Sequence, residues 1–211
     1  MTLASALGLM MVAGCSNQEI DDANLQGKAA SVVEQVSEAT EETATAEALS
    51  GPTLGETFPV ESLVSVDGAA LTLADLTAES GGVVVLSRSA EWCPFCQKQM
   101  VDLKDSQAQL EAMGMKLSVI TYDAPEILSG FAAENGIEYQ FVSDTGSETI
   151  KALNLLNTDV DEGSRVFGVP HPAVIVLAAD GEMRNLHVGT DYRVRPSNAD
   201  VIALAADVDG G

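Results

Sequence analysis

The alternation of apolar and polar positions divides the chain after residue 50 into short strands and amphipathic helices. An apolar run without alternation, 83–86, is typical of a central strand that is buried on both faces of a sheet. Apolar segments bounded by turn residues predict a short hairpin at 64–73 and strands at 117–122, 139–142, 173–178 and 183–188. Polar stretches with regularly spaced apolar residues predict helices at 74–79, 97–115, 123–136, 147–156 and 196–208.

The order of these elements predicts an α/β fold. Strands and helices alternate from residue 83 to residue 156 at the spacing of βαβ units, which requires parallel strands covered by helices on both faces. The last section differs, because Asp180-Gly181 joins two strands into an antiparallel hairpin before a closing helix. We therefore expect a central mixed sheet flanked by helices, with no internal repeat and no transmembrane segment.

The first fourteen residues are apolar or small and carry no charged side chain. They are too short to span a bilayer as a mature helix, and they are typical of the apolar core of a secretory signal. Val12-Ala13-Gly14-Cys15 resembles the bacterial lipobox, in which a cysteine is lipidated and becomes the new N-terminus after cleavage. The resemblance implies a lipoprotein signal peptide at 1–14, lipidation of Cys15, and a lipid anchor at the cell envelope of a bacterium. On this reading the domain faces the periplasmic or extracytoplasmic side of the membrane. No basic residue precedes the apolar core, so an incidental cysteine on an apolar tail is the alternative.

Residues 15–50 have the composition of an acidic flexible tether. Between residues 16 and 50 there are eight acidic residues, Lys28 as the one basic residue, and no aromatic residue. The domain is expected to begin near Gly51-Pro52 and to cover 51–211. Over the whole chain 32 Asp and Glu stand against 10 Lys and Arg, which argues against a partner such as nucleic acid that binds a basic patch.

Two cysteines, Cys93 and Cys96, stand where the predicted central strand passes into a helix. The unpaired amides and positive dipole end of that helix favour a thiolate at the first sulfur, and such placement lowers a thiol pKa from about 8.5. The chain has three cysteines, so assigning Cys15 to lipid leaves this one pair. A disulfide that closes so short a loop would stabilise the fold little, which indicates a reversible redox role.

The turn resembles the active site of thioredoxin-fold proteins. Trp92-Cys93-Pro94-Phe95-Cys96, a Val-Pro-x-Pro-Ala stretch at 169–173 and an Asp-Tyr-x-x-Arg segment at 191–195 are similar to the peroxiredoxin-like (redoxin) subgroup of the alkyl hydroperoxide reductase C/thiol-specific antioxidant family. The resemblance covers about 51–208. It implies a thioredoxin-like fold with an N-terminal peroxiredoxin-type extension. It also implies a hydroperoxide or protein disulfide as substrate and a dithiol reductant such as a thioredoxin-like protein. We expect neither a cofactor nor a metal.

Several neighbours of the dithiol take roles from this resemblance. Trp92 would shield the active-site turn, and Pro94 suits the first turn of the helix. The fold's cis-proline would fall at Pro172, where it would shape a docking slot against Cys93. His171 beside it is either an imidazolium that favours the thiolate or an ordinary loop histidine.

Charged residues near the motif have two readings each. Arg88, Arg193 and Arg195 are candidates to polarise a peroxide or stabilise a thiolate, although arginines are more often solvated surface charges. Glu91 could relay a proton, but an exposed turn residue is the more frequent case. His187, in the second strand of the hairpin, is interpreted as structural.

Two departures from known patterns limit the resemblance. The buried acid that thioredoxins place six residues before the first cysteine would fall at Ser87, so that proton acceptor is missing. The Pro-x-x-x-Thr-x-x-Cys pattern of peroxiredoxins meets Ser89 and Cys93 when laid on Cys96, and Leu86 and Ala90 when laid on Cys93. Neither register fits.

Three functions and one metal site therefore compete. The favoured hypothesis is a thiol-dependent peroxidase with antioxidant activity at the cell envelope, in which Cys93 attacks and Cys96 resolves. A thiol-disulfide oxidoreductase acting on exported proteins would use the same sulfurs. A lipoprotein whose fold serves as a binding module would need neither sulfur. Structural zinc needs four ligands, usually in two pairs, and this sequence has no second pair.

Overall fold

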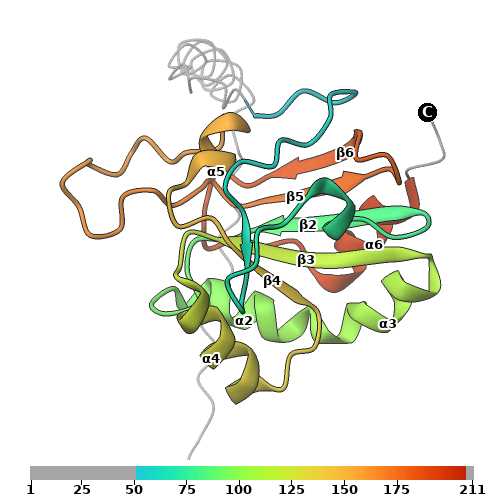
Figure 1. Cartoon of the computed structure of the whole chain (residues 1–211), viewed down its shortest axis with the longest axis horizontal. Coiled ribbons are helices and arrows are strands. Elements are labelled where there is room, and N and C mark those ends of the chain that lie inside the picture. Colours follow the sequence, from blue (N-terminus) through green and yellow to red (C-terminus); the bar gives the residue numbers. More distant parts are fainter. Residues whose placement is uncertain (1–50, 208–211) are drawn as a thin grey trace, which may run out of the picture. The chain divides into compact units, whose positions relative to one another are not determined.

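The computed structural model describes residues 51–207, which form a mixed sheet between two layers of helices and loops (Figure 1). The predicted signal peptide, tether and Cys15 lie outside the described residues. The strands are β1 Val64–Ser65, β2 Gly81–Leu86, β3 Met115–Thr121, β4 Gln140–Ser143, β5 Ala173–Leu177 and β6 Met183–Val188. The helices are the 3-10 helix η1 Leu73–Asp75, α2 Pro94–Asp102, α3 Lys104–Ala112, α4 Pro125–Asn135, α5 Glu148–Ala152 and α6 Asn198–Ala206.

Strand β2 lies in the middle of the sheet, as the unbroken apolar run predicted. The strand order is β1-β4-β3-β2-β5-β6, with β2 parallel to β3 and antiparallel to β5. Strand β4 runs parallel to β3, and β6 pairs antiparallel with β5. The predicted mixed sheet is therefore confirmed, and the ends of β2 and β3 that precede helices meet at one edge.

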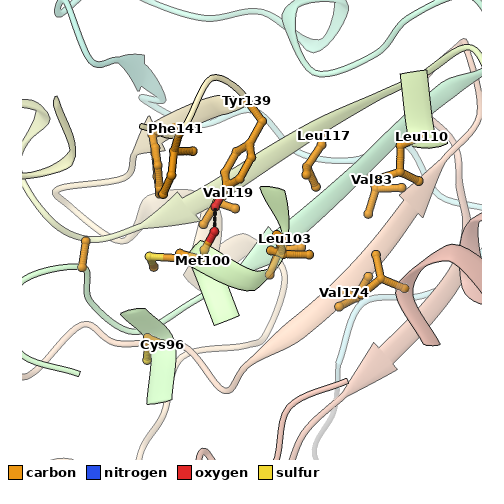
Figure 2. Close-up of a cluster of buried hydrophobic side chains, with 14 of the residues drawn as sticks. Val83, Cys96, Met100, Leu103, Leu110, Leu117, Val119, Tyr139, Phe141 and Val174 are labelled. Atoms are coloured by element: carbon orange, nitrogen blue, oxygen red, sulfur yellow. Dashed lines mark hydrogen bonds between the residues drawn. The ribbon is translucent and has the colours of Figure 1, made fainter. Parts of the chain in front are cut away.

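Alternate residues of β2 enter two separate cores. Val83 and Val85 face the layer of α2, α3, α4 and α6, where they pack with side chains such as Met100 and Leu110 (Figure 2). Val84 and Leu86 face the opposite layer, which contains α5 and the segment that precedes β2. Both faces of the strand are thus buried, which explains why no polar residue interrupts the run.

The single helix predicted for 97–115 is wrong, because the chain forms two helices that meet at Leu103. Two backbone carbonyls of this turn bind side chains from elsewhere in the fold. The Tyr139 hydroxyl donates to the Met100 carbonyl (Figure 2), and the Asn198 amide donates to the Asp102 carbonyl at 2.7 Å. Carbonyls engaged in this way are turned away from the helical ladder, so the helix breaks and restarts.

The helix predicted at 74–79 is also wrong, since only a 3-10 turn forms there. Asp75 accepts hydrogen bonds from the backbone N–H and the hydroxyl of Thr72, at 2.8 and 2.7 Å. This capping box holds one turn, after which Leu76 is buried in the core. The hairpin predicted at 64–73 is reduced to the two-residue β1, which pairs with β4, and an isolated bridge between Val64 and Ala70. The other predicted helices and strands are present with ends that differ by a few residues. Within residues 51–207 no helix is long and apolar enough to cross a membrane.

Candidate active site

The two cysteines lie at the start of α2, beyond the end of β2. Cys93 is the N-cap residue of the helix and Pro94 is its first residue, where the missing N–H of proline costs no hydrogen bond. Cys93 and Cys96 form a disulfide, with their Cα atoms 5.2 Å apart. They are 1% and 0% exposed, so in this oxidised state the sulfurs are closed off from solvent.

A buried carboxylate holds the loop that leads to the disulfide. Asp123 accepts hydrogen bonds from the Ser89 hydroxyl at 2.8 Å, from the Ala90 N–H at 2.6 Å and from the Thr121 hydroxyl at 2.9 Å. Burial raises the pKa of this carboxyl, although its hydrogen bonds act in the opposite direction. Sequence reasoning had placed Asp123 at the start of a helix, but α4 begins at Pro125, and the carboxylate serves the neighbouring loop.

Trp92 and Gln97 fix the rest of the turn. The Trp92 indole N–H donates to the Tyr122 hydroxyl at 2.9 Å, and the two rings meet edge to face. The Gln97 side chain donates to the carbonyls of Ala90 and Glu91 at 2.8 and 3.0 Å. Trp92 therefore packs beside the turn against Tyr122. Position 87, where thioredoxins carry a buried acid, holds a serine in this chain. Its hydroxyl is buried without a hydrogen-bond partner.

Arg88, a candidate to support the site, is buried against aromatic rings and is not a solvated surface charge. It is 8% exposed, and its guanidinium carbon lies 5.2 Å from the Trp92 ring centre and 4.3 Å from that of Tyr192. Such cation–π contacts stabilise a buried guanidinium. Phe95, on the first turn of α2, meets the Tyr192 ring edge to face at 5.9 Å. The segment around Tyr192 is thereby held against the dithiol turn.

Arg195 touches the disulfide itself. Its Nη2 donates to Cys96 Sγ at 3.1 Å. Burial, together with the nearby charge of Arg88, lowers the pKa of Arg195 to about 10, so the group stays a cation at neutral pH. Arg193 does not share this position, because its side chain is exposed and lies 3.7 Å from the Asp191 carboxylate. Of the three candidate arginines, Arg88 and Arg195 are therefore at the site and Arg193 is on the surface.

Glu91 is exposed, in agreement with the simpler of its two readings, and His187 is exposed on β6. Tyr192, Tyr122 and Asp123 were not singled out as site residues in the sequence. The Asp-Tyr-x-x-Arg segment was a signal for Tyr192. The carboxylate could have been found from its place directly after β3, because β3 lies beside β2 and ends at the same edge of the sheet.

The predicted cis bond before Pro172 is wrong, since residues 51–207 contain no cis peptide bond. The backbone on both sides of Pro172 is engaged in extended pairing. The His171 N–H donates to the Leu155 carbonyl, and the Pro172 carbonyl accepts from the Gly189 N–H, both at 2.7 Å. The chain therefore passes straight into β5.

His171 is buried, and of its two readings the imidazolium is the one that the structure does not favour. Desolvation lowers the pKa of its ring, and the Arg88 charge acts in the same direction, against the opposite effect of Asp159. At neutral pH the imidazole is consequently uncharged. The cation in contact with a sulfur is the guanidinium of Arg195 instead.

The burial of His171 predicts a pH dependence of stability. Because its pKa lies below the ordinary value of 6.5, the unfolded chain binds a proton first as the pH falls. The contribution of His171 to the free energy of unfolding is therefore complete above pH 6.5 and is lost as the pH falls through the lowered pKa. His171→Gln should flatten this part of the profile, measured as urea-unfolding midpoints between pH 5 and 8. The exposed His187→Gln is the matched control, and an equal flattening in both variants would contradict the assignment.

Metal binding finds no support in the described part of the chain. Within residues 51–207, no group of three or more His, Cys, Asp or Glu side chains is arranged to hold a metal ion. Both sulfurs of the pair are bonded to each other. The residues around them can bind an anion or stabilise a thiolate, and they can exchange electrons through the sulfurs.

Comparisons with known proteins agree with this geometry. A family model described as "AhpC/TSA family" matches residues 54–186. Peroxiredoxin Bcp of Escherichia coli is 26% identical over 139 residues, which cover 66% of this chain and 86% of that protein. A thiol peroxidase structure from Chromobacterium violaceum has a TM-score of 0.61 at 19% identity, covering 74% of this chain and 88% of that one. Reduced Prx3 of Vibrio vulnificus in complex with hydrogen peroxide has a TM-score of 0.62 at 18% identity, covering 74% of this chain and 99% of that one. These structures confirm the expected thioredoxin-like fold.

Proposed function

Because this chain belongs to the AhpC/TSA family, whose model matches residues 54–186, we propose that it is a thiol-dependent peroxidase that works through Cys93 and Cys96. The observation that carries the proposal is the disulfide between these two residues at the N-terminus of α2. It is the oxidised product that such a cycle would leave. Sulfurs so close in a chain interconvert between dithiol and disulfide without a rearrangement of the fold.

In the proposed cycle the Cys93 thiolate attacks the terminal oxygen of a hydroperoxide. The O–O bond breaks, the alcohol or water leaves with a proton, and Cys93 becomes a sulfenic acid. The Cys96 thiolate then attacks the Cys93 sulfur, and the sulfenic oxygen leaves as water once it gains a proton. A dithiol reductant such as a thioredoxin-like protein takes the disulfide back to two thiols.

In this proposal the two sulfurs have different supports. Cys93, at the N-cap, faces the free amides and the positive dipole end of α2, which favour a thiolate. Asp123 and Trp92 act through the backbone, because they hold the loop on which Cys93 is presented. Since Cys93 is only 1% exposed in the disulfide form, side chains over the sulfur must move before a substrate or reductant reaches it.

A thiol-disulfide oxidoreductase acting on exported proteins is the second candidate. It is favoured by apolar side chains exposed around the turn, Phe95 at 41% and Val194 at 67%, which a polypeptide substrate could cover.

Lipidation at Cys15 and a location at the cell envelope are also part of the proposed function. They rest on the sequence of residues 1–50.

The two candidates can be separated with the full chain carrying Cys15→Ser, in which only the pair retains thiols. We expect hydrogen peroxide or an organic hydroperoxide to be consumed in proportion to dithiothreitol oxidised, and faster than the same protein reduces insulin disulfides. Faster insulin reduction with no peroxide turnover would favour the second candidate. If neither reaction occurs, the binding-module reading replaces both.

A further inference from the structure

The disulfide has an unequal electrostatic environment. Arg195 Nη2 lies 3.1 Å from the sulfur of Cys96. Among the hydrogen bonds and ion pairs of residues 51–207, no cationic side chain makes a corresponding contact with the sulfur of Cys93. Cys96 is fully buried, so its sulfur has no water to offset a charge that forms on it. The neighbouring guanidinium is therefore the group that decides how stable a Cys96 thiolate is.

Arg195 lacks a carboxylate partner within the described residues. Its Nε and Nη1 atoms are buried without a hydrogen-bond partner, and so is Nε of Arg88. None of the ion pairs found in residues 51–207 includes either arginine. A buried cation without a negative neighbour is costly, and a thiolate formed beside it offsets part of that cost. The two arginines are thus arranged for a negative charge that the disulfide form does not yet carry.

This asymmetry bears on how the disulfide opens. An incoming thiolate can attack either sulfur, and the other sulfur then leaves with the electron pair of the broken bond. Departure is easier for the sulfur whose thiolate is better stabilised. The dipole of α2 favours a thiolate at Cys93. A charge-assisted hydrogen bond in a buried site is stronger than this typical helix-end effect, so the guanidinium contact outweighs it and favours Cys96 as the leaving sulfur.

We propose that Arg195 makes Cys96 the leaving thiolate during reduction, so that the reductant forms its mixed disulfide with Cys93, an inference that rests on the dithiol cycle proposed above. In the first step the reductant thiolate bonds to the Cys93 sulfur, the Cys93–Cys96 bond breaks, and Cys96 keeps the electron pair as a thiolate. In the second step the other thiol of the reductant attacks the reductant's own sulfur in the mixed disulfide. Cys93 then leaves as the thiolate that meets the next peroxide.

The same contact affects the redox equilibrium. Arg195 stabilises the reduced form, in which Cys96 carries a charge, more than the disulfide, in which it does not. Its removal should shift the equilibrium toward the disulfide at least about tenfold, which corresponds to a reduction potential about 30 mV lower. Trp92 is the only tryptophan of the chain and adjoins Cys93, so its fluorescence can report the redox state.

The test uses full-length Cys15→Ser protein and its Arg195→Met, Arg195→Gln and Arg195→Lys variants, with Arg184→Met as the matched control. Arg184 is an exposed arginine that pairs with Glu182 away from the disulfide. Equilibration against glutathione, followed by Trp92 fluorescence, gives the reduction potential. Rapid mixing with reduced glutathione and iodoacetamide, followed by mass spectrometry, shows which cysteine carries glutathione and which is alkylated.

In the parent and in Arg184→Met, we expect glutathione on Cys93 and the alkyl group on Cys96. In Arg195→Met and Arg195→Gln, the preference for glutathione on Cys93 should weaken and the reduction potential should fall. Arg195→Lys, which keeps a positive charge, should restore part of the preference and part of the potential. Glutathione found mainly on Cys96 in the parent, or parent-like behaviour of whichever neutral variant folds, would overturn the proposal. Neither measurement requires peroxide, so a protein without peroxidase activity can still pass this test, and an active peroxidase can fail it.

Discussion

Cys93→Ser is expected to abolish peroxide-dependent oxidation of the reductant, with a fall on the order of 10³-fold or more. A serine hydroxyl at this N-cap has no thiolate to offer, and the helix amides that favour a thiolate cannot ionise an alcohol at neutral pH. The measurement is the rate of hydroperoxide consumption with dithiothreitol, in the Cys15→Ser background.

Cys96→Ser provides the informative comparison. It should still react once with peroxide, leaving a sulfenic acid on Cys93 that dimedone traps, but the intramolecular disulfide cannot form. Cys15→Ser alone should keep the full rate in solution. Persistent turnover in Cys93→Ser, or a dimedone adduct on Cys96 in that variant, would reverse the roles of the two sulfurs.

Asp123→Ala is expected to lower the free energy of unfolding by about 3 kcal/mol, because three donors lose their acceptor in a buried site. The Ala90 N–H lies in the loop that carries Cys93, so the variant should also turn over peroxide more slowly. Urea denaturation of the oxidised protein measures the first effect, and the peroxide assay measures the second.

Asp123→Asn should lose less stability than Asp123→Ala, since its side chain keeps one acceptor oxygen. Asp161→Ala is the matched control. Asp161 is exposed, so its loss should change the free energy of unfolding by less than about 0.5 kcal/mol. If Asp123→Ala proves as stable as this control, the carboxylate does not brace the loop.

Much of the fold could be predicted from local pattern. The run 83–86 predicted a central strand because a strand with two buried faces has no polar position. The hairpin of β5 and β6 was predicted because Asp180-Gly181 is a turn signal between two apolar segments. The unbroken apolar run and the turn signal each lie within a few neighbouring residues, so the sequence alone is enough to predict them.

The errors arose where distant residues override local preference. The helix break at Leu103 depends on Tyr139 and Asn198, which take carbonyls that the local pattern assigns to the helix. The two readings of His171 could not be separated from the sequence for a related reason. Its charge state depends on burial and on Arg88, and neither can be read from the residues beside it.

The sequence by itself determined where the cysteine pair lies, because Cys93 and Cys96 are three residues apart and their strand-to-helix setting is local. Only the tertiary structure decided which side chains hold the loop of Cys93 and which side chain contacts the sulfur of Cys96. Arg195 contacts Cys96, which lies 99 residues earlier in the sequence, and Asp123 contacts Ala90 of the active-site loop, which lies 33 residues earlier. Such contacts depend on the order in which strands pair and on which side chains are then buried together, and the one-dimensional pattern of apolar and polar residues does not contain that information.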